Sequence, residues 1–187
     1  MAHVMETLRE DHKNMTQLLD LMESQIAAIR GEQQPNFDLL NEAVSYCLTY
    51  PKLYHHPKED QVYRRLVQMG ISPDQVGDME TAHEDLQGLT KRLSNLLKKA
   101  GAAGDVNRET LASLVESFIK SYRLHIDAEE KIFFPLAEER LQAADWKAID
   151  AELASMADPL FGDRAPLDYG SLKGALLEAY GRQATGT

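Results

Sequence analysis

Residues 111–136 read LASLVESFIKSYRLHIDAEEKIFFPL and carry the pattern that decides the fold. Large side chains recur at alternating steps of four and three residues, which places them on one face of an α-helix. Two positions on that face are polar, His125 and Glu129. The segment is therefore predicted to be an amphipathic helix with a polar layer inside its apolar face. The complete stripe is Leu111, Val115, Phe118, Tyr122, His125, Glu129, Ile132 and Leu136.

Three earlier segments, at about residues 5–29, 37–69 and 72–97, repeat this periodicity. Glycine and proline separate them at residues 31–35, at Gly70 and again at residues 101–104. Pro51 and Pro57 lie inside the second segment and predict a kink there, and Pro135 predicts a bend in the last one. Four long amphipathic helices with short connections predict an all-α, up-down-up-down four-helix bundle.

The chain beyond the fourth helix is expected to be an appendage of this bundle. We assign residues 1–142 to the bundle and residues 143–187 to a short helical C-terminal extension packed on it. Within the extension, a short helix is predicted around residues 146–156 and a weaker one over residues 172–180. The segment Asp158-Pro159-Leu160-Phe161-Gly162 between them is rich in turn-forming residues.

Composition excludes several classes of function. Twenty lysine and arginine residues stand against 30 aspartate and glutamate residues, for a net charge of −10, so a nucleic-acid partner is not expected. No apolar run approaches the roughly 20 residues that span a bilayer, and the N-terminal residues do not resemble a signal peptide. Cys47 is the single cysteine, which excludes an internal disulfide. We expect a cytoplasmic protein with no membrane partner.

Six polar residues occupy positions on the predicted apolar stripes. A buried carboxylate carries a large desolvation cost unless it is paired. Each stripe glutamate lies four residues after a stripe histidine, so one helical turn aims an imidazole and a carboxylate at the same point. The six residues are His12, His55, Glu59, His83, His125 and Glu129.

The spacing of these residues repeats along the chain. His125 follows His55 by 70 residues and Glu129 follows Glu59 by 70, while His83 follows His12 by 71. Each half would be a helical hairpin that supplies two histidines and one glutamate, about what a pair of metal ions needs in a bundle core. Isolated core histidines, or glutamates paired with Lys or Arg, are the alternative, but no Lys or Arg shares these stripes. Imidazole and carboxylate without thiolate favour iron over manganese or zinc.

Two assignments stay open at this point. His56 and Asp60 have the same spacing as His55 and Glu59 and could replace them as ligands, although the stripe and the 70-residue repeat favour the latter pair. Tyr122 lies one turn before His125, so its phenol could give a proton or an electron to a metal-bound oxidant. Equally, Tyr122 could be a core aromatic residue whose hydroxyl finds a partner.

From about Thr7 to Arg140, the order His, His-x-x-x-Glu, His, His-x-x-x-Glu resembles one branch of the hemerythrin-like family. This resemblance implies a non-haem di-iron centre. It implies terminal nitrogen ligands at His12, His55, His83 and His125. It further implies that Glu59 and Glu129 bridge the two iron ions beside an oxo or hydroxo group.

The sequence departs from the oxygen-carrying members of that family at two positions. Those proteins have His-x-x-x-His in the third helix, where this chain has Gln87 after His83, and they end on an aspartate rather than Glu129. This favours binding of, or reaction with, a small diatomic or peroxide ligand (O₂, peroxide or nitric oxide) over simple oxygen carriage. Whether the protein turns its ligand over as an enzyme stays open. The alternatives are an iron- or redox-sensing regulatory module without turnover and a purely structural bundle.

Overall fold

The computed structural model describes residues 2–31, 33–77, 79–103, 106–153 and 170–180. Its regular elements within these ranges are all helical, which confirms the predicted all-α class. The long helices are α1 (His3–Ser24), α3 (Phe37–Tyr50), α6 (Met79–Ala103) and α7 (Arg108–Ala128). The shorter ones are α2 (Ile26–Arg30), α4 (His56–Gln68), α5 (Pro73–Val76), α8 (Phe134–Arg140), α9 (Ala143–Leu153) and α10 (Gly170–Tyr180).

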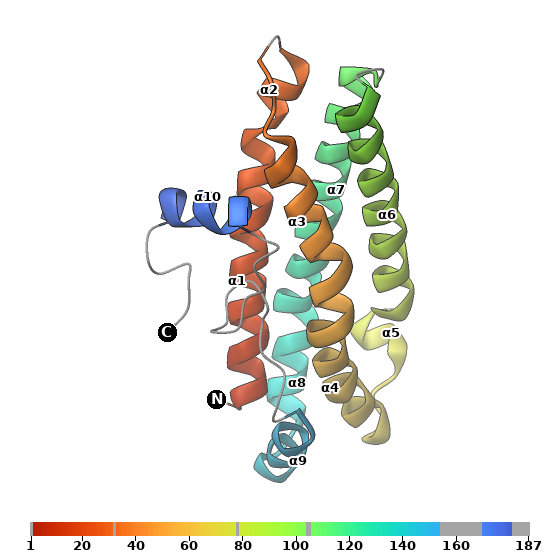
Figure 1. The fold of residues 1–187 in the computed structure, drawn as a ribbon. Helices are drawn as coiled ribbons and strands as arrows, with labels where there is room; N and C mark the ends of the chain where they lie inside the picture. Colours follow the sequence, from red (N-terminus) through yellow and green to blue (C-terminus); the bar gives the residue numbers. More distant parts are fainter. Residues whose placement is uncertain (1, 32, 78, 104–105, 154–169, 181–187) are drawn as a thin grey trace.

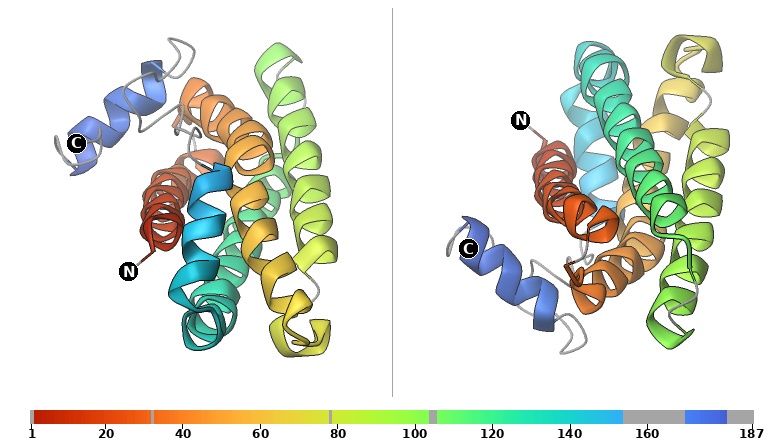
Figure 2. Two further views of the ribbon diagram at one scale, coloured as in Figure 1. Left: turned by 90° about the horizontal axis from the view of Figure 1, so that it is seen from below. Right: turned by 90° about the horizontal axis from the view of Figure 1, so that it is seen from above.

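The long helices lie side by side and enclose a common core (Figures 1 and 2). α1 packs against α3, α4 and α7, and α6 packs against α3 and α7. α4 and α8 meet at the lower end of the view in Figure 1. Segments far apart in the sequence therefore share one interior, and each contributes its apolar stripe to it.

Two five-residue π-helical turns interrupt the long helices: η1 (Pro51–His55) between α3 and α4, and η2 (Glu129–Phe133) between α7 and α8. In each, a backbone N–H donates to the carbonyl five residues earlier, from His56 to Pro51 and from Phe134 to Glu129. Single π turns inside α-helices are frequent at functional sites. The irregularity predicted at Pro51 thus takes the form of a wider helical turn.

Proline chemistry explains where η1 lies. Pro51 has no N–H to donate to the Cys47 carbonyl one turn earlier, and the Tyr122 hydroxyl donates to that carbonyl instead, at 3.4 Å. Pro57 falls in the first turn of α4 and Pro135 in the first turn of α8, where a missing N–H costs least.

Two details of the predicted helices are wrong. Ile132, assigned to the buried stripe, is 54% exposed, because η2 shifts the register and Phe133 and Phe134 face the core instead. The third helix does not run unbroken from Ser72: α5 ends at Val76, and Gly77 adopts a φ of +85° before α6 begins. Glycine tolerates this positive φ, which most side chains do not.

The described core contains two clusters of buried apolar side chains with a polar layer between them. One cluster extends from Met15 on α1 through α3, α6 and α7. The other contains Leu8 on α1, Val62 and Leu66 on α4, and Phe133 and Phe134 near α8. On α1 the gap between the clusters falls at Asp11 and His12, which are themselves buried. The polar layer predicted from the sequence is therefore sealed above and below by hydrocarbon.

The described helices of the C-terminal extension both pack on the rest of the chain. α9 contacts α1 and α4, and α10 contacts α3 and α1. The turn-rich segment 158–162 lies outside the described residues, and the domain division at residue 142 stays a prediction. Across the described ranges, no helix is both long enough and apolar enough to cross a membrane.

Candidate metal centre

The six polar stripe residues converge in the layer between the two apolar clusters. Ligand atoms of His12, His55, Glu59 and Glu129 all lie within 4.8 Å of one another. The His83 Nε2 atom lies 3.4 Å from Glu59 Oε2 and 3.5 Å from Glu129 Oε1. His125 Nε2 lies 3.0 Å from Glu129 Oε1. The structure thus brings together the six stripe residues that the sequence favours as metal ligands.

The four histidines form two pairs, and the two glutamate carboxylates lie between these pairs. Glu59 points Oε1 at His55 Nε2 (3.3 Å) and Oε2 at His83. Glu129 points Oε2 at His12 Nε2 (3.2 Å) and Oε1 at His83 and His125. Each carboxylate therefore faces both pairs. We call the His12–His55 pair the sealed side and the His83–His125 pair the open side.

Several atoms at the centre have no hydrogen-bond partner among the described residues. They are both carboxylate oxygens of Glu59, both of Glu129, and the Nε2 atoms of His83 and His125. The two glutamates are 0% and 2% exposed. Leaving so many buried polar atoms unsatisfied is costly, whereas cations placed among them would neutralise the carboxylates and use the nitrogen lone pairs. The donor set fits a metal centre on these grounds.

On the sealed side, carboxylates hold the outer nitrogen of each ring. His55 Nδ1 donates to Asp11 Oδ2 at 3.2 Å, and His12 Nδ1 donates to Glu130 Oε1 at 2.8 Å. With Nδ1 donating to a carboxylate, Nε2 is the nitrogen of each ring that faces the centre, and it can bind a cation once its proton has left. The Phe134 ring stacks on His12 with centroids 5.1 Å apart and closes that flank.

Asp11 is the centre of a buried network that the sequence reading missed. Besides His55, it accepts hydrogen bonds from the Tyr50 hydroxyl (2.9 Å) and the Lys58 ammonium (3.1 Å), and Lys58 is only 3% exposed. Lys58 does not lie on the stripe of Glu59, and its charge meets Asp11 instead. The sequence carried one signal: Asp11 and Lys58 directly precede the two stripe residues His12 and Glu59.

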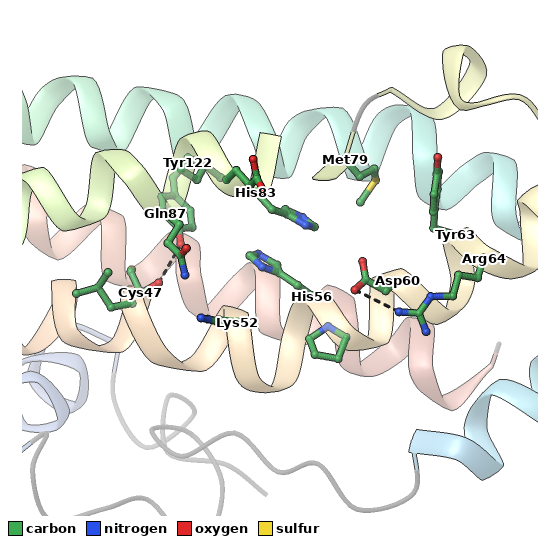
Figure 3. Close-up of a pocket in the computed structure, with 14 residues that line it drawn as sticks. Cys47, Lys52, His56, Asp60, Tyr63, Arg64, Met79, His83, Gln87 and Tyr122 are labelled. Atoms are coloured by element: carbon green, nitrogen blue, oxygen red, sulfur yellow. Dashed lines mark hydrogen bonds and ion pairs between the residues drawn. The ribbon is translucent and has the colours of Figure 1, made fainter. Parts of the chain in front are cut away.

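The open side faces a surface cavity of about 550 Å³ between α3–α4 and α6 (Figure 3). His83 and His56 line its inner wall, and Gln87, Met79 and Tyr122 contribute to the lining. No residue of the sealed pair lines it. The cavity therefore connects solvent to one side of the site.

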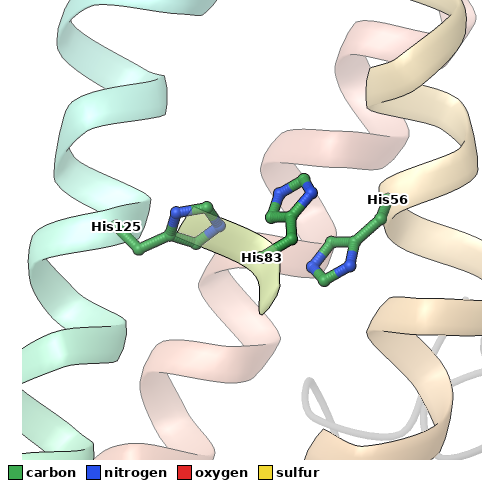
Figure 4. A group of neighbouring side chains, drawn as sticks. All are labelled: His56, His83 and His125. Atoms are coloured by element: carbon green, nitrogen blue, oxygen red, sulfur yellow. The ribbon is translucent and has the colours of Figure 1, made fainter. Parts of the chain in front are cut away.

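His56 belongs to the open side. Its ring stacks on that of His83 with centroids 3.6 Å apart and an interplanar angle of 7°. One ring nitrogen each of His56, His83 and His125 lie within 4.8 Å of one another (Figure 4). Asp60, the alternative carboxylate, lies away from this layer and pairs with Arg64 at 3.8 Å on the cavity wall. The structure thus places Glu59 rather than Asp60 at the centre, and places both His55 and His56 beside it.

The pKa values of the site histidines follow from the buried carboxylates. Burial by itself lowers the pKa of His55, but Glu59 and Asp11 outweigh it and raise that pKa to about 10. The pKa of His83 rises to about 9, again against burial, because Glu129 and Glu59 face it. Burial and the neighbouring histidines together lower the pKa of His56 to about 3, so this ring stays neutral. Protons and metal ions thus compete for the same atoms of His55 and His83.

Tyr122 and Cys47 lie beside the site without joining its donor atoms. The Tyr122 hydroxyl donates to the Cys47 backbone carbonyl, and burial raises the pKa of the phenol well above its ordinary value. Burial also raises the pKa of the Cys47 thiol, to about 12, so the thiol stays protonated. The hydroxyl of Tyr122 has the structural partner expected of a core aromatic residue.

Residues 3–137 match the sequence model of the hemerythrin HHE cation-binding domain. The chain belongs to the hemerythrin HHE family. That family is described as cation-binding, and the histidine and glutamate atoms that converge in this hemerythrin domain form groups that could hold a metal ion.

Known relatives of this hemerythrin-family chain add no activity to the comparison. Uncharacterized proteins of Mycobacterium bovis and of two Mycobacterium tuberculosis strains are each 24% identical to it over 143 residues, which is 76% of this chain. The match covers 56% of the length of each relative, so the chain spans about half of the proteins it resembles. No solved structure matches it significantly.

Proposed function

We propose that this protein is a non-haem di-iron protein that binds or reacts with a small redox ligand, namely O₂, peroxide or nitric oxide. The proposal rests on the arrangement of Glu59 and Glu129. Each carboxylate directs one oxygen toward the sealed-side histidines and the other oxygen toward the open-side histidines. A carboxylate shared in this way suits two cations close together. Helices α1, α3–α4, α6 and α7–α8 would be the four members of an up-down-up-down bundle.

The proposed ligands are the six residues named from the sequence. His12 and His55 would hold one ion, His83 and His125 the other, and Glu59 and Glu129 would bridge them, with an oxygen bridge completing the pair. Imidazole and carboxylate donors suit iron, and the thiol of Cys47 takes no part. When bound, two iron ions supply one-electron redox chemistry to a small ligand.

The chain's own contribution is to orient the donors and to control access. Asp11 and Glu130 hold the sealed-side rings from their Nδ1 atoms, so the Nε2 atoms already face the place where a cation would bind. Apolar side chains above and below the layer exclude water. The cavity admits small molecules at His83 and leaves the opposite pair covered.

Metal analysis with an absorption spectrum tests this proposal. We expect two iron ions per chain and an oxo-bridged ferric absorption that bleaches on reduction. Glu59→Ala and Glu129→Ala should each lose both ions, because each removes oxygen atoms that face both histidine pairs. Glu84→Ala, an exposed glutamate beside His83, is the matched control and should retain both ions. Retention of two ions by Glu59→Ala and Glu129→Ala would refute the ligand assignment.

Kinetics on the same samples separates the two candidate functions. Rapid turnover of peroxide or consumption of nitric oxide by the wild-type protein, lost in Glu59→Ala, supports an enzyme. Stoichiometric binding without turnover, together with a metal-dependent change in proteolysis of the C-terminal extension, supports a sensor. Each result leaves the metal analysis above as an independent test of the centre itself.

A further inference from the structure

The cavity beside the open side is much larger than O₂, peroxide or nitric oxide requires. Its volume is about 550 Å³, whereas one water molecule occupies roughly 30 Å³ of the liquid. Protein cavities of this size typically hold small organic molecules. The lining combines apolar side chains, among them Leu48, Met79 and Leu86, with a few polar ones. The cavity therefore has room for a second, organic ligand beside His83.

Two hydrogen-bond donors face each other at one end of this cavity. Lys52 on η1 and Gln87 on α6 both line it, and Figure 3 shows the Lys52 ammonium and the Gln87 amide turned toward one another. The Gln87 Oε1 atom accepts a hydrogen bond from Lys91 Nζ at 3.3 Å, which leaves the NH₂ group of this amide available to a ligand. An ammonium can only donate. Such a pair of donors is stabilised by an acceptor between them.

The carboxylates that line the cavity do not neutralise the charge of Lys52. Asp60 pairs with Arg64 at 3.8 Å, and neither Lys52 nor Glu84 forms an ion pair within the part of the chain that the structure describes. Because the whole chain carries a net charge of −10, an anion needs a local cation to offset the repulsion that it meets. Lys52 supplies that charge at the cavity wall.

We propose that this cavity binds a small organic carboxylate, which accepts hydrogen bonds from the Lys52 ammonium and the Gln87 amide. A carboxylate suits these two donors because each of its oxygens can accept from one of them. Gln87 follows His83 by one helical turn on α6, so the body of the ligand lies in the cavity beside His83. The inference goes beyond the proposed function and does not depend on bound metal, because neither donor is a proposed metal ligand.

Binding of 4-fluorobenzoate to the chain, followed by fluorine NMR, tests the proposal without an activity assay. Lys52→Ala should weaken binding about tenfold, and Gln87→Leu should weaken it severalfold, because each removes one donor. Lys52→Arg should retain most of the affinity, because arginine keeps the positive charge and can donate. Lys13→Ala removes the same charge from an exposed position on α1 and is the matched control, which should bind like wild type.

Two further probes define the chemistry of the ligand. 4-Fluorobenzyl alcohol keeps the ring without the charge, so it should bind roughly tenfold more weakly and should not respond to Lys52→Ala. Formate keeps the carboxylate but leaves most of the cavity unfilled, so it should compete roughly tenfold more weakly than the benzoate. Equal benzoate affinity in Lys52→Ala and Lys13→Ala would overturn the proposal, and so would equal affinity for formate and benzoate.

Metal analysis of the same preparations keeps this test separate from that of the proposed function. Lys52→Ala should retain the wild-type metal content. Benzoate binding that depends on Lys52 in a protein without iron would uphold the carboxylate site and refute the proposed function. Two bound iron ions without benzoate binding would support the proposed function and overturn the carboxylate site.

Discussion

The sealed side and the open side contribute two stripe histidines each, yet their surroundings differ. On the sealed side, Asp11 and Glu130 hold the rings from behind, and Phe134 covers one flank. On the open side, His83 has a neighbouring histidine ring on one face and borders a cavity of about 550 Å³. The comparison suggests a division of labour in which one ion is anchored and the other is available to a ligand.

The largest expected effect comes from removing one imidazole on each side. His55→Ala should lose the sealed-side ion and His125→Ala the open-side ion, so each should fall from two bound ions to one. Spectra of the remaining cobalt(II) ion should differ between the variants, because the retained sites have different donors. Identical spectra would show that the two metal positions are equivalent, which would contradict the proposed difference between the sealed side and the open side.

Asp11→Asn should come next in size. The substitution removes the anion that orients His55, and metal affinity on that side should fall roughly 10- to 100-fold. It also leaves the Lys58 charge buried without its partner, which should cost about 3–5 kcal/mol of unfolding free energy. Metal titration and denaturant unfolding measure the two effects.

A double variant separates orientation from stability. In Asp11→Asn/Lys58→Met the unpaired charge is gone, so the unfolding free energy should recover while metal affinity on the sealed side stays low. Recovery of both quantities together would mean that Asp11 acts only through folding. In that case the carboxylate would have no positioning role toward His55.

Access through the cavity should have a smaller effect. Gln87→Trp fills part of the cavity beside His83 and should slow the binding of azide, a small anionic probe, by about tenfold without changing the metal content. Lys13→Trp, an exposed position on α1, is the control. If azide binds Gln87→Trp at the wild-type rate, the cavity is not the route to the centre.

The smallest expected effect concerns the packing of α9 against α1 and α4, the helices behind the sealed side. Asp145 accepts hydrogen bonds from Arg65 on α4 and from the Gln142 backbone, and these hold its pKa below the ordinary value. A lowered carboxyl pKa means that the contribution to stability is present above the unfolded-state pKa, about 3.9, and is lost as pH falls through the folded-state value.

Trp146, the single tryptophan, reports this contact. Its fluorescence should show α9 loosening as the pH falls below about 4, and Asp145→Asn should show a slightly lower melting temperature at pH 7 with no such acid transition. An unchanged acid transition in Asp145→Asn would assign it to another carboxylate. Metal content at pH 7 should not change, because α9 supports α1 and α4 without contributing donor atoms.

The sequence was sufficient to predict the all-α class and the convergence of the six stripe residues, because both depend on periodicity within one chain segment. Four-residue spacing in His55–Glu59 and His125–Glu129 is a local property, and the 70-residue repeat relates the two halves. The class of fold and the convergence of these residues followed from those two facts.

What the sequence could not predict depends on contacts between segments or on small changes of helical register. The pairing of Asp11 with Lys58 joins α1 to α4, and no spacing within either segment reveals it. η2 moves Ile132 to the surface by inserting a wider turn after Glu129, which a strict heptad reading cannot anticipate. The place of His56 beside His83 likewise depends on how α4 and α6 pack.

Anomalous diffraction from crystals of the iron-loaded protein tests the central claim most directly. We predict two iron peaks per chain, one beside His12 and His55 and one beside His83 and His125. Both should lie within bonding distance of Glu59 and Glu129. A single peak, or peaks away from these two carboxylates, would contradict it.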